Sequence, residues 1–270
     1  MKYKLIATDY DYTLASINHK ASSYTKEVIN QYIKQGGLFT IATGRMTNGL
    51  LANLDGVNVN APVITYQGAK VVDAVSCKVL KHYGISPALA SEFISRLARY
   101  DCPINVYIND TLYVEKYYQG IERYIQANKI NYNIAPNGLA DLIIKTNQPC
   151  SKILALLEED LALKLEQQLG QEYKGKLNIT RSAPTFLETN DILASKGRGV
   201  EFIADLYNIK RENIMCFGDS TNDISMLKFA GLGVAVGNAM PEVLETADII
   251  CENYDQDGLA HTIEKYCLTK

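Results

Sequence analysis

Three short polar clusters each follow directly upon a run of apolar and β-branched residues. The clusters begin at Asp9, Thr43 and Gly218. The apolar runs before them span residues 4–8, 38–42 and 213–217. Runs this short and this rich in β-branched residues predict buried strands of a parallel sheet rather than helices. Because ligands of open α/β sheets bind beyond the carboxyl ends of the strands, the three clusters are expected to meet in one site.

Composition narrows the class of protein. The chain has 270 residues, 47% of them hydrophobic and 21% charged, with a formal net charge of −3. These values predict a soluble globular protein and argue against nucleic acid or anionic membrane as partners. The apolar stretch near the N-terminus is too short for a signal peptide, and the longest aliphatic run, 153–157, is far below the roughly 20 residues that cross a bilayer. A cytoplasmic location is therefore expected, and the oligomeric state is left open.

The order of predicted elements indicates two domains. Strand–helix–strand alternation occupies both ends of the chain, where Ser22 or Ser23 caps a helix that runs to Lys34. The middle instead contains antiparallel pairs, such as the hairpin that turns at Asn109-Asp110. We expect an α/β fold in which a Rossmann-like parallel sheet carries helices on both faces and an α+β domain is inserted. The predicted boundaries are 1–82 and 186–270 for the two parts of the core and 83–185 for the insert.

The acidic residues of the clusters predict a metal site. Side chains alternate along an extended segment, so Asp9 and Asp11 are expected to project the same way. Asp219 and Asp223 would bring four carboxylates into one crevice, which repel one another unless a cation intervenes. Mg²⁺ suits such a site because it prefers oxygen ligands and binds phosphate oxygens.

The same residues suggest phosphoryl transfer. A carboxylate such as Asp9 can attack phosphorus, and Asp11 can protonate the leaving oxygen and later take a proton from water. Thr43 and the amide of Gly44 can hold phosphoryl oxygens. Lys196 follows a possible helix cap at Ser195 and adds positive charge there. Asn222 can position phosphate or a water, while Asp223 is expected to orient groups around the metal.

These motifs resemble those of the haloacid dehalogenase superfamily, in particular its Cof-type phosphatases of subfamily IIB, which carry a large C2 cap. The resemblance rests on Asp9-x-Asp11-x-Thr13, Thr43, Lys196 and Gly218-Asp219-x-x-Asn222-Asp223. It implies that Asp9 is the nucleophile and Asp11 the general acid/base. It also implies Mg²⁺ bound by Asp9, the backbone carbonyl of Asp11 and Asp219. The phosphate contacts that it implies are the Tyr10 backbone, Thr43, Gly44, Lys196 and Asn222.

Two residues depart from the family pattern, and one role stays open. Tyr12 stands where glycine is common, and Gln67 stands where asparagine is common. Arg45 is either a phosphate clamp or a partner in a structural salt bridge. The long segment between Arg45 and Lys196 places the inserted cap between the second and third motifs, where such caps exclude water and select the substrate.

The expected function is therefore Mg²⁺-dependent hydrolysis of a small phosphorylated metabolite, such as a sugar phosphate, through an aspartyl-phosphate. Two alternatives are open at this point. The aspartyl-phosphate could pass to a sugar hydroxyl, which would make the chain a phosphotransferase or sugar phosphomutase. The chain could also be a regulatory module that binds phosphate without turnover.

Overall fold

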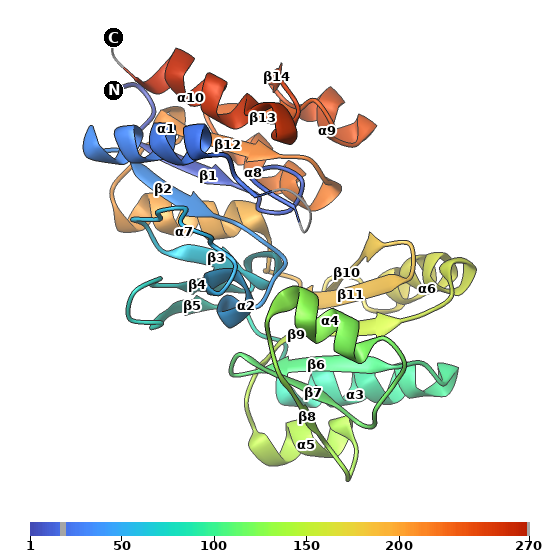
Figure 1. The fold of residues 1–270 in the computed structure, drawn as a ribbon. Helices are drawn as coiled ribbons and strands as arrows, with labels where there is room; N and C mark the ends of the chain where they lie inside the picture. The colour runs from blue at the N-terminus through green and yellow to red at the C-terminus, as the bar shows by residue number, and fades with distance from the viewer. Residues whose placement is uncertain (17–19, 269–270) are drawn as a thin grey trace. The chain divides into compact units, whose positions relative to one another are not determined.

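The structure is a computed structural model that describes residues 1–16 and 20–268 (Figure 1). Within those residues, every helix is too short or too polar to cross a membrane.

The chain divides into two compact units, each with its own hydrophobic core. The core unit and the inserted unit are described separately below. The core unit comprises residues 1–45, 50–81 and 195–270. The inserted unit comprises residues 46–49 and 82–194.

A parallel sheet of five strands forms the centre of the core unit, in the order β14-β13-β12-β1-β2. Its strands are β1 (Leu5–Thr8), β2 (Leu38–Ile41), β12 (Ile214–Gly218), β13 (Leu232–Val236) and β14 (Ile249–Cys251). The central strand β1 is buried at all four positions and pairs with β2 on one side and β12 on the other. The three apolar runs that precede the polar clusters are thus strands of one parallel sheet, as predicted, and the structure shows that they are neighbours in it.

Helices cover both faces of this sheet, because successive side chains of each strand point to opposite sides. Ile6 packs in one cluster with α1 and α10, which lie side by side (Figure 1), while Leu5 and Ala7 pack in the other with α7, α8 and α9. The helices are α1 (Ser23–Lys34), α7 (Lys196–Leu206), α8 (Ile224–Phe229), α9 (Pro241–Thr246) and α10 (Gly258–Cys267). Ser22 caps α1 and Ser195 caps α7, each through its side-chain oxygen. The predicted fold class is confirmed.

A smaller sheet follows β2 in the core unit. It consists of β3 (Val63–Thr65), β4 (Lys70–Val72) and β5 (Val79–His82), and the short helix α2 (Thr47–Leu51) precedes it. An isolated parallel bridge joins Ala42 to Ile64, so β3 continues beside the end of β2. The turn after β3, Tyr66–Gly68, therefore lies next to the loop that begins at Thr43.

The inserted unit is a mixed sheet of six strands, in the order β10-β11-β9-β6-β7-β8. Its strands are β6 (Ile104–Ile108), β7 (Thr111–Val114), β8 (Tyr132–Ile134), β9 (Cys150–Leu156), β10 (Leu177–Ala183) and β11 (Phe186–Asp191). Its helices are α3 (Pro87–Leu97), α4 (Ile121–Asn128), α5 (Leu139–Thr146) and α6 (Glu159–Glu172). Strands β6 and β7 form the predicted hairpin, with Asn109 and Asp110 at positive φ in its turn.

One predicted boundary differs from the structure. The sequence prediction ended the insert at Thr185 and assigned the following residues to the core, whereas the inserted unit extends to Ala194. Strand β11 pairs with both β10 and β9 and is therefore an interior strand of the inserted sheet. Strand β10 lies across a hairpin from β11, and β9 is distant from it in sequence. Local periodicity does not reveal which sheet a strand joins.

Candidate active site

The predicted site residues all lie in the core unit, in loops that follow strand ends or at a helix start. Asp9 follows β1, Thr43 follows β2 and Asp219 follows β12. The amide of Asp9 donates to the carbonyl of Phe217 at 3.0 Å, and the amide of Ala42 donates to the carbonyl of Thr8 at 2.8 Å. Backbone pairing therefore continues past the strands and fixes where the first polar residues stand.

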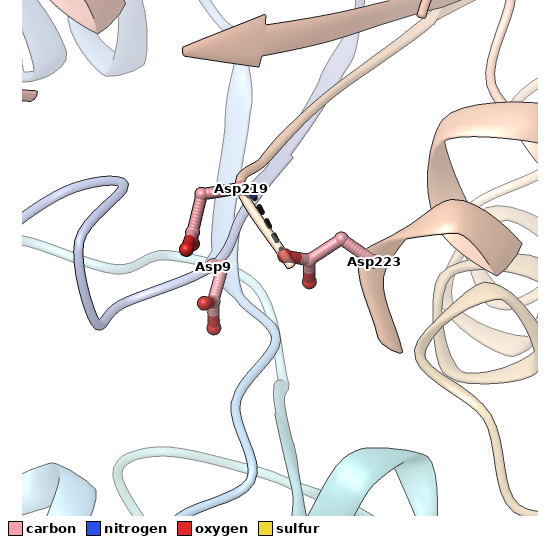
Figure 2. Close-up of side chains that lie close together, drawn as sticks. All are labelled: Asp9, Asp219 and Asp223. Atoms are coloured by element: carbon pink, nitrogen blue, oxygen red, sulfur yellow. Dashed lines mark hydrogen bonds between the residues drawn. The ribbon is translucent and has the colours of Figure 1, made fainter. Parts of the chain in front are cut away.

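Three carboxylates gather at this edge of the sheet. One oxygen from each of Asp9, Asp219 and Asp223 lies within 4.8 Å of the others, and all three side chains are buried. Figure 2 shows these side chains and the hydrogen bond from the amide of Asp219 to Asp223. Asp223 Oδ2 accepts from the amides of Asp219 and Ser220, both at 3.0 Å. Asp223 thus holds the loop after β12 in place.

Two hydroxyl groups fix Asp219. Thr13 Oγ1 donates to Asp219 Oδ1 at 2.7 Å, and Ser220 Oγ donates to Asp219 Oδ2 at 2.8 Å. The first of these bonds joins the loop after β1 to the loop after β12. The last residue of the Asp9-x-Asp11-x-Thr13 motif therefore orients the carboxylate that was predicted to bind metal.

Lys196 enters the cluster from the start of α7. Its Nζ lies 2.7 Å from Asp9 Oδ1 and 2.6 Å from Asp223 Oδ1, and the side chain is 1% exposed. Lysine is almost never fully buried unless it is paired, and Lys196 is paired with two carboxylates. Burial alone would lower the pKa of Lys196, but Asp223 and Asp9 raise it, and the net pKa lies above its ordinary value.

Burial dominates the electrostatics of the acids. It raises the pKa of Asp9, Lys196 opposes that rise, and the nearby carboxylates Asp223, Asp219 and Asp11 reinforce it, so that the pKa lies well above its ordinary value. Burial also raises the pKa of Asp219, with Asp223 adding to the rise and Thr13 opposing it. Charged carboxylates are thus unfavourable here in the absence of a further cation.

The residues present fit a divalent cation. Lys196 supplies one positive charge to three carboxylates, so the cluster keeps an excess of negative charge. Carboxylate oxygens are the ligands that Mg²⁺ prefers, and a bound cation would offset the repulsion that raises the pKa of Asp9 and Asp219. The donor set therefore matches the predicted metal.

Asp11 does not join the carboxylate cluster as predicted. Its two oxygens accept from Arg45, with Nε at 2.8 Å and Nη2 at 2.6 Å. This bidentate pair turns the carboxylate toward the loop after β2, although Asp11 still lies near enough to raise the pKa of Asp9. The prediction of four clustered carboxylates was wrong because alternation along an extended segment does not hold in this loop, which bends at Tyr10, between the two aspartates. For Arg45, the structure shows the salt bridge.

The residues predicted to contact phosphate each have identifiable neighbours in the structure. Thr43 is buried, and its Oγ1 accepts from the amide of Arg45 at 3.2 Å. The Tyr10 side chain is buried beneath the Arg45 guanidinium, 4.8 Å from its ring centroid, so only the Tyr10 backbone suits the predicted role. Asn222 donates through Nδ2 to Gln67 Oε1 at 3.0 Å. Gly44 packs against Gln67 as well, since a Cβ there would lie 2.5 Å from Gln67 Nε2.

Gln67 is the site residue that sequence reasoning did not include. It was noted only as a departure from the family pattern, yet its side chain contacts two residues that were predicted to bind phosphate, Asn222 and Gly44. The signal was present in the sequence, because Tyr66-Gln67-Gly68 follows a fourth apolar run that ends at the same edge of the sheet.

Comparisons with known proteins agree with this geometry. A model of the haloacid dehalogenase-like hydrolase family matches residues 6–263. The putative phosphatase YxeH of Bacillus subtilis is 27% identical over 275 residues, covering 99% of this chain and all of that protein. The 5-amino-6-(5-phospho-D-ribitylamino)uracil phosphatase YwtE of the same organism is 26% identical, with 97% of each chain covered. The solved structure of TM0651 from Thermotoga maritima has a TM-score of 0.85 and 28% identity, covering 99% of this chain and 98% of that one.

The family match spans nearly the whole chain, and the relatives match end to end. The buried acids and the lysine of the core unit fall within the matched residues. The chain therefore belongs to the haloacid dehalogenase-like hydrolase family and is a hydrolase of the phosphatase type.

Proposed function

We propose that this enzyme is a Mg²⁺-dependent phosphatase that acts in the cytoplasm on a small phosphorylated metabolite, such as a sugar phosphate. The observation that carries the proposal is the position of Asp9, a buried carboxylate 2.7 Å from Lys196 and clustered with Asp219 and Asp223. A nucleophile needs a fixed orientation and a neighbouring positive charge to meet an anionic phosphate, and Asp9 has both.

The first step is attack of Asp9 on phosphorus. A bond forms between a carboxylate oxygen of Asp9 and phosphorus, and the bond from phosphorus to the ester oxygen breaks. Asp11 gives a proton to the departing oxygen, so the alcohol leaves neutral. This role requires Asp11 to be protonated and to release Arg45 at that moment, because a neutral carboxyl group no longer forms an ion pair.

The second step returns the enzyme to its starting form. A water molecule attacks phosphorus, Asp11 takes its proton, and the bond between phosphorus and Asp9 breaks to release inorganic phosphate. In this step Asp11 acts as the carboxylate that accepts the proton, and Arg45 Nη2 lies 2.6 Å from its Oδ1. Lys196, Thr43, the Gly44 amide, the Tyr10 backbone and Asn222 would hold the phosphoryl oxygens.

The proposed ligands of Mg²⁺ are the side chains of Asp9 and Asp219 and the backbone carbonyl of Asp11. When bound, the cation offsets the negative charge of the phosphoryl group and of the carboxylates that surround it. Asp223 orients the loop through the amides of Asp219 and Ser220.

The substrate class rests on the relatives and on the insert. YwtE is named for a phosphorylated ribityl compound, a small metabolite that carries a phosphate on a sugar-like chain. We propose a substrate of similar size here, and we propose that the inserted unit is the cap that selects it.

The test is phosphate release from p-nitrophenyl phosphate and from a panel of phosphorylated sugars, nucleotides and cofactors, with Mg²⁺ or with EDTA. We expect activity with Mg²⁺ only, and loss of at least about a thousandfold in Asp9→Asn with an unchanged circular dichroism spectrum. Asp255→Asn, at an exposed site, is the matched control. Activity retained in Asp9→Asn would rule out this nucleophile.

The same panel separates the alternatives. Conversion of one hexose phosphate into another without free phosphate would indicate a mutase or phosphotransferase. Binding of phosphate without hydrolysis of any compound would indicate a regulatory module.

A further inference from the structure

The turn between β3 and β4 has an unusual backbone. Three consecutive residues have positive φ: Tyr66 at 54°, Gln67 at 59° and Gly68 at 94°. Glycine adopts this region freely, but a residue with a side chain there is held at a cost of about 1 to 3 kcal/mol. The surroundings of Tyr66 and Gln67 must therefore fix them in place.

Backbone contacts on two sides fix this turn. The amide of Tyr66 donates to the carbonyl of Arg45, and the amide of Gln67 donates to the carbonyl of Thr43, each at 3.0 Å. On the other side, a Cβ on Gly68 would lie 2.0 Å from the carbonyl oxygen of Ser195. The turn thus packs between the Thr43 loop and the start of α7, where Lys196 lies.

The Gln67 side chain extends this link to a third segment. It is 9% exposed, and its Oε1 accepts from Asn222 Nδ2 at 3.0 Å. Its Nε2 lies against Gly44, at the position that a Cβ of residue 44 would need. The oxygen of Asn222 is buried and has no hydrogen-bond partner among the described residues, so the bond to Gln67 is what orients this amide.

We propose that Gln67 is a positioning residue for phosphate binding, a role that rests on the proposed function of this site. An amide nitrogen carries two hydrogens. Gln67 Oε1 takes one hydrogen of Asn222, which fixes the direction of the other toward the phosphoryl group. Gln67 also sets how closely the Gly44 backbone approaches that group. The strained residue Gln67 thereby fixes the positions of Asn222 and Gly44 relative to each other.

The experiment measures binding of inorganic phosphate by isothermal titration calorimetry, with Mg²⁺ present. Gln67→Gly removes the amide and suits the positive φ, so its fold is retained. We expect the dissociation constant of phosphate to rise about tenfold, the effect of one lost hydrogen bond. The KM of a hydrolysed substrate should rise by a similar factor, while kcat should change less than about threefold.

Two further variants sharpen the test. Gln67→Glu keeps the acceptor for Asn222 but places a carboxylate oxygen beside Gly44, so it should weaken phosphate binding more than Gln67→Gly does. Gln31→Ala, at an exposed position on α1, is the control that should leave the dissociation constant unchanged.

A double-mutant cycle identifies the route of the effect. Because Gln67 acts in part through Asn222, adding Gln67→Gly to Asn222→Ala should weaken phosphate binding by a clearly smaller factor than Gln67→Gly does in the wild-type protein. Fully additive effects, an unchanged dissociation constant in Gln67→Gly, or a loss of kcat at constant KM would each overturn the proposal.

Binding and turnover separate this proposal from the proposed function. A wild-type protein that binds phosphate but hydrolyses nothing would refute the phosphatase, and the calorimetric comparison would still decide the role of Gln67. A wild-type protein that binds no phosphate at all would refute the positioning role itself.

Discussion

At the scale of single residues, the site is defined by charged side chains that are buried. Asp9, Asp219 and Asp223 are buried with Lys196, and charged groups are rarely buried so completely without a functional reason. The sequence identified all four residues, because each lies beside a recognisable strand end or helix cap. It did not identify Arg45 as the partner of Asp11, since an ion pair depends on where two loops meet.

The raised pKa of Asp219 predicts a pH-dependent stability. A carboxyl group whose pKa is higher in the folded state than in the unfolded state destabilises the fold once it is ionised. In EDTA, this penalty should appear as pH rises from about 4, the unfolded pKa, through the raised folded pKa, and should then stay constant. Asp219→Asn lacks the penalty, so its stability relative to wild type should increase over that pH range.

Urea unfolding of both proteins between about pH 4 and pH 8 measures this difference. Adding Mg²⁺ at the upper pH should stabilise wild type more than Asp219→Asn, because the variant loses a proposed ligand. A stability difference that shrinks as pH rises in EDTA would contradict the assigned cause.

At the scale of elements, side-chain hydrogen bonds join the starts of the first and last helices of the core unit. Asp257 precedes α10 and accepts at Oδ1 from Ser22 Oγ at 2.6 Å and from Thr25 Oγ1 at 2.7 Å. Both hydroxyl groups belong to the start of α1. Asp257 is thus a structural residue far in sequence from its partners.

Asp257→Ala should lower the free energy of unfolding by about 2 kcal/mol, because two partly buried hydrogen bonds lose their acceptor and alanine is strained at a φ of 57°. Asp257→Asn should retain most of the stability, since asparagine keeps an acceptor oxygen and tolerates positive φ. Denaturant unfolding measures both variants. Equal losses in the two would mean that the charge of Asp257, rather than its hydrogen bonds, stabilises the fold.

The predicted bounds of a helix agree with the structure where a neighbouring residue caps that helix. Helix α1 begins after the Ser22 cap and ends at Lys34 as predicted. After β12, by contrast, the chain first forms a 3-10 turn at Thr221–Asp223, and α8 begins only at Ile224. There the Asp223 carboxylate binds the amides of Asp219 and Ser220, which tightens the first turn.

At the scale of the whole molecule, the two units have separate cores. The core of the inserted unit is built by α3, α5 and α6 against one face of its sheet. A unit with its own core and its own sheet can fold by itself.

We therefore expect the excised segment 82–194 to fold. Its thermal unfolding, followed by circular dichroism, should be a single cooperative transition, and it should release no phosphate from any compound, because the acids and the lysine lie in the core unit. A segment that stays unfolded in the absence of residues 46–49 and the core would show that the insert depends on the rest of the chain.

The sequence by itself predicted the parallel sheet with helices on both faces and the polar clusters that follow its strands. These follow from local patterns: apolar runs for buried strands, serine caps for helices and short polar motifs at their ends. Only the tertiary structure decided that Asp11 pairs with Arg45, that β11 belongs to the inserted sheet and that Gln67 joins Thr43 to Asn222. Pairing partners and the positive φ of Gln67 are set by contacts between segments distant in sequence, and local patterns do not encode such contacts.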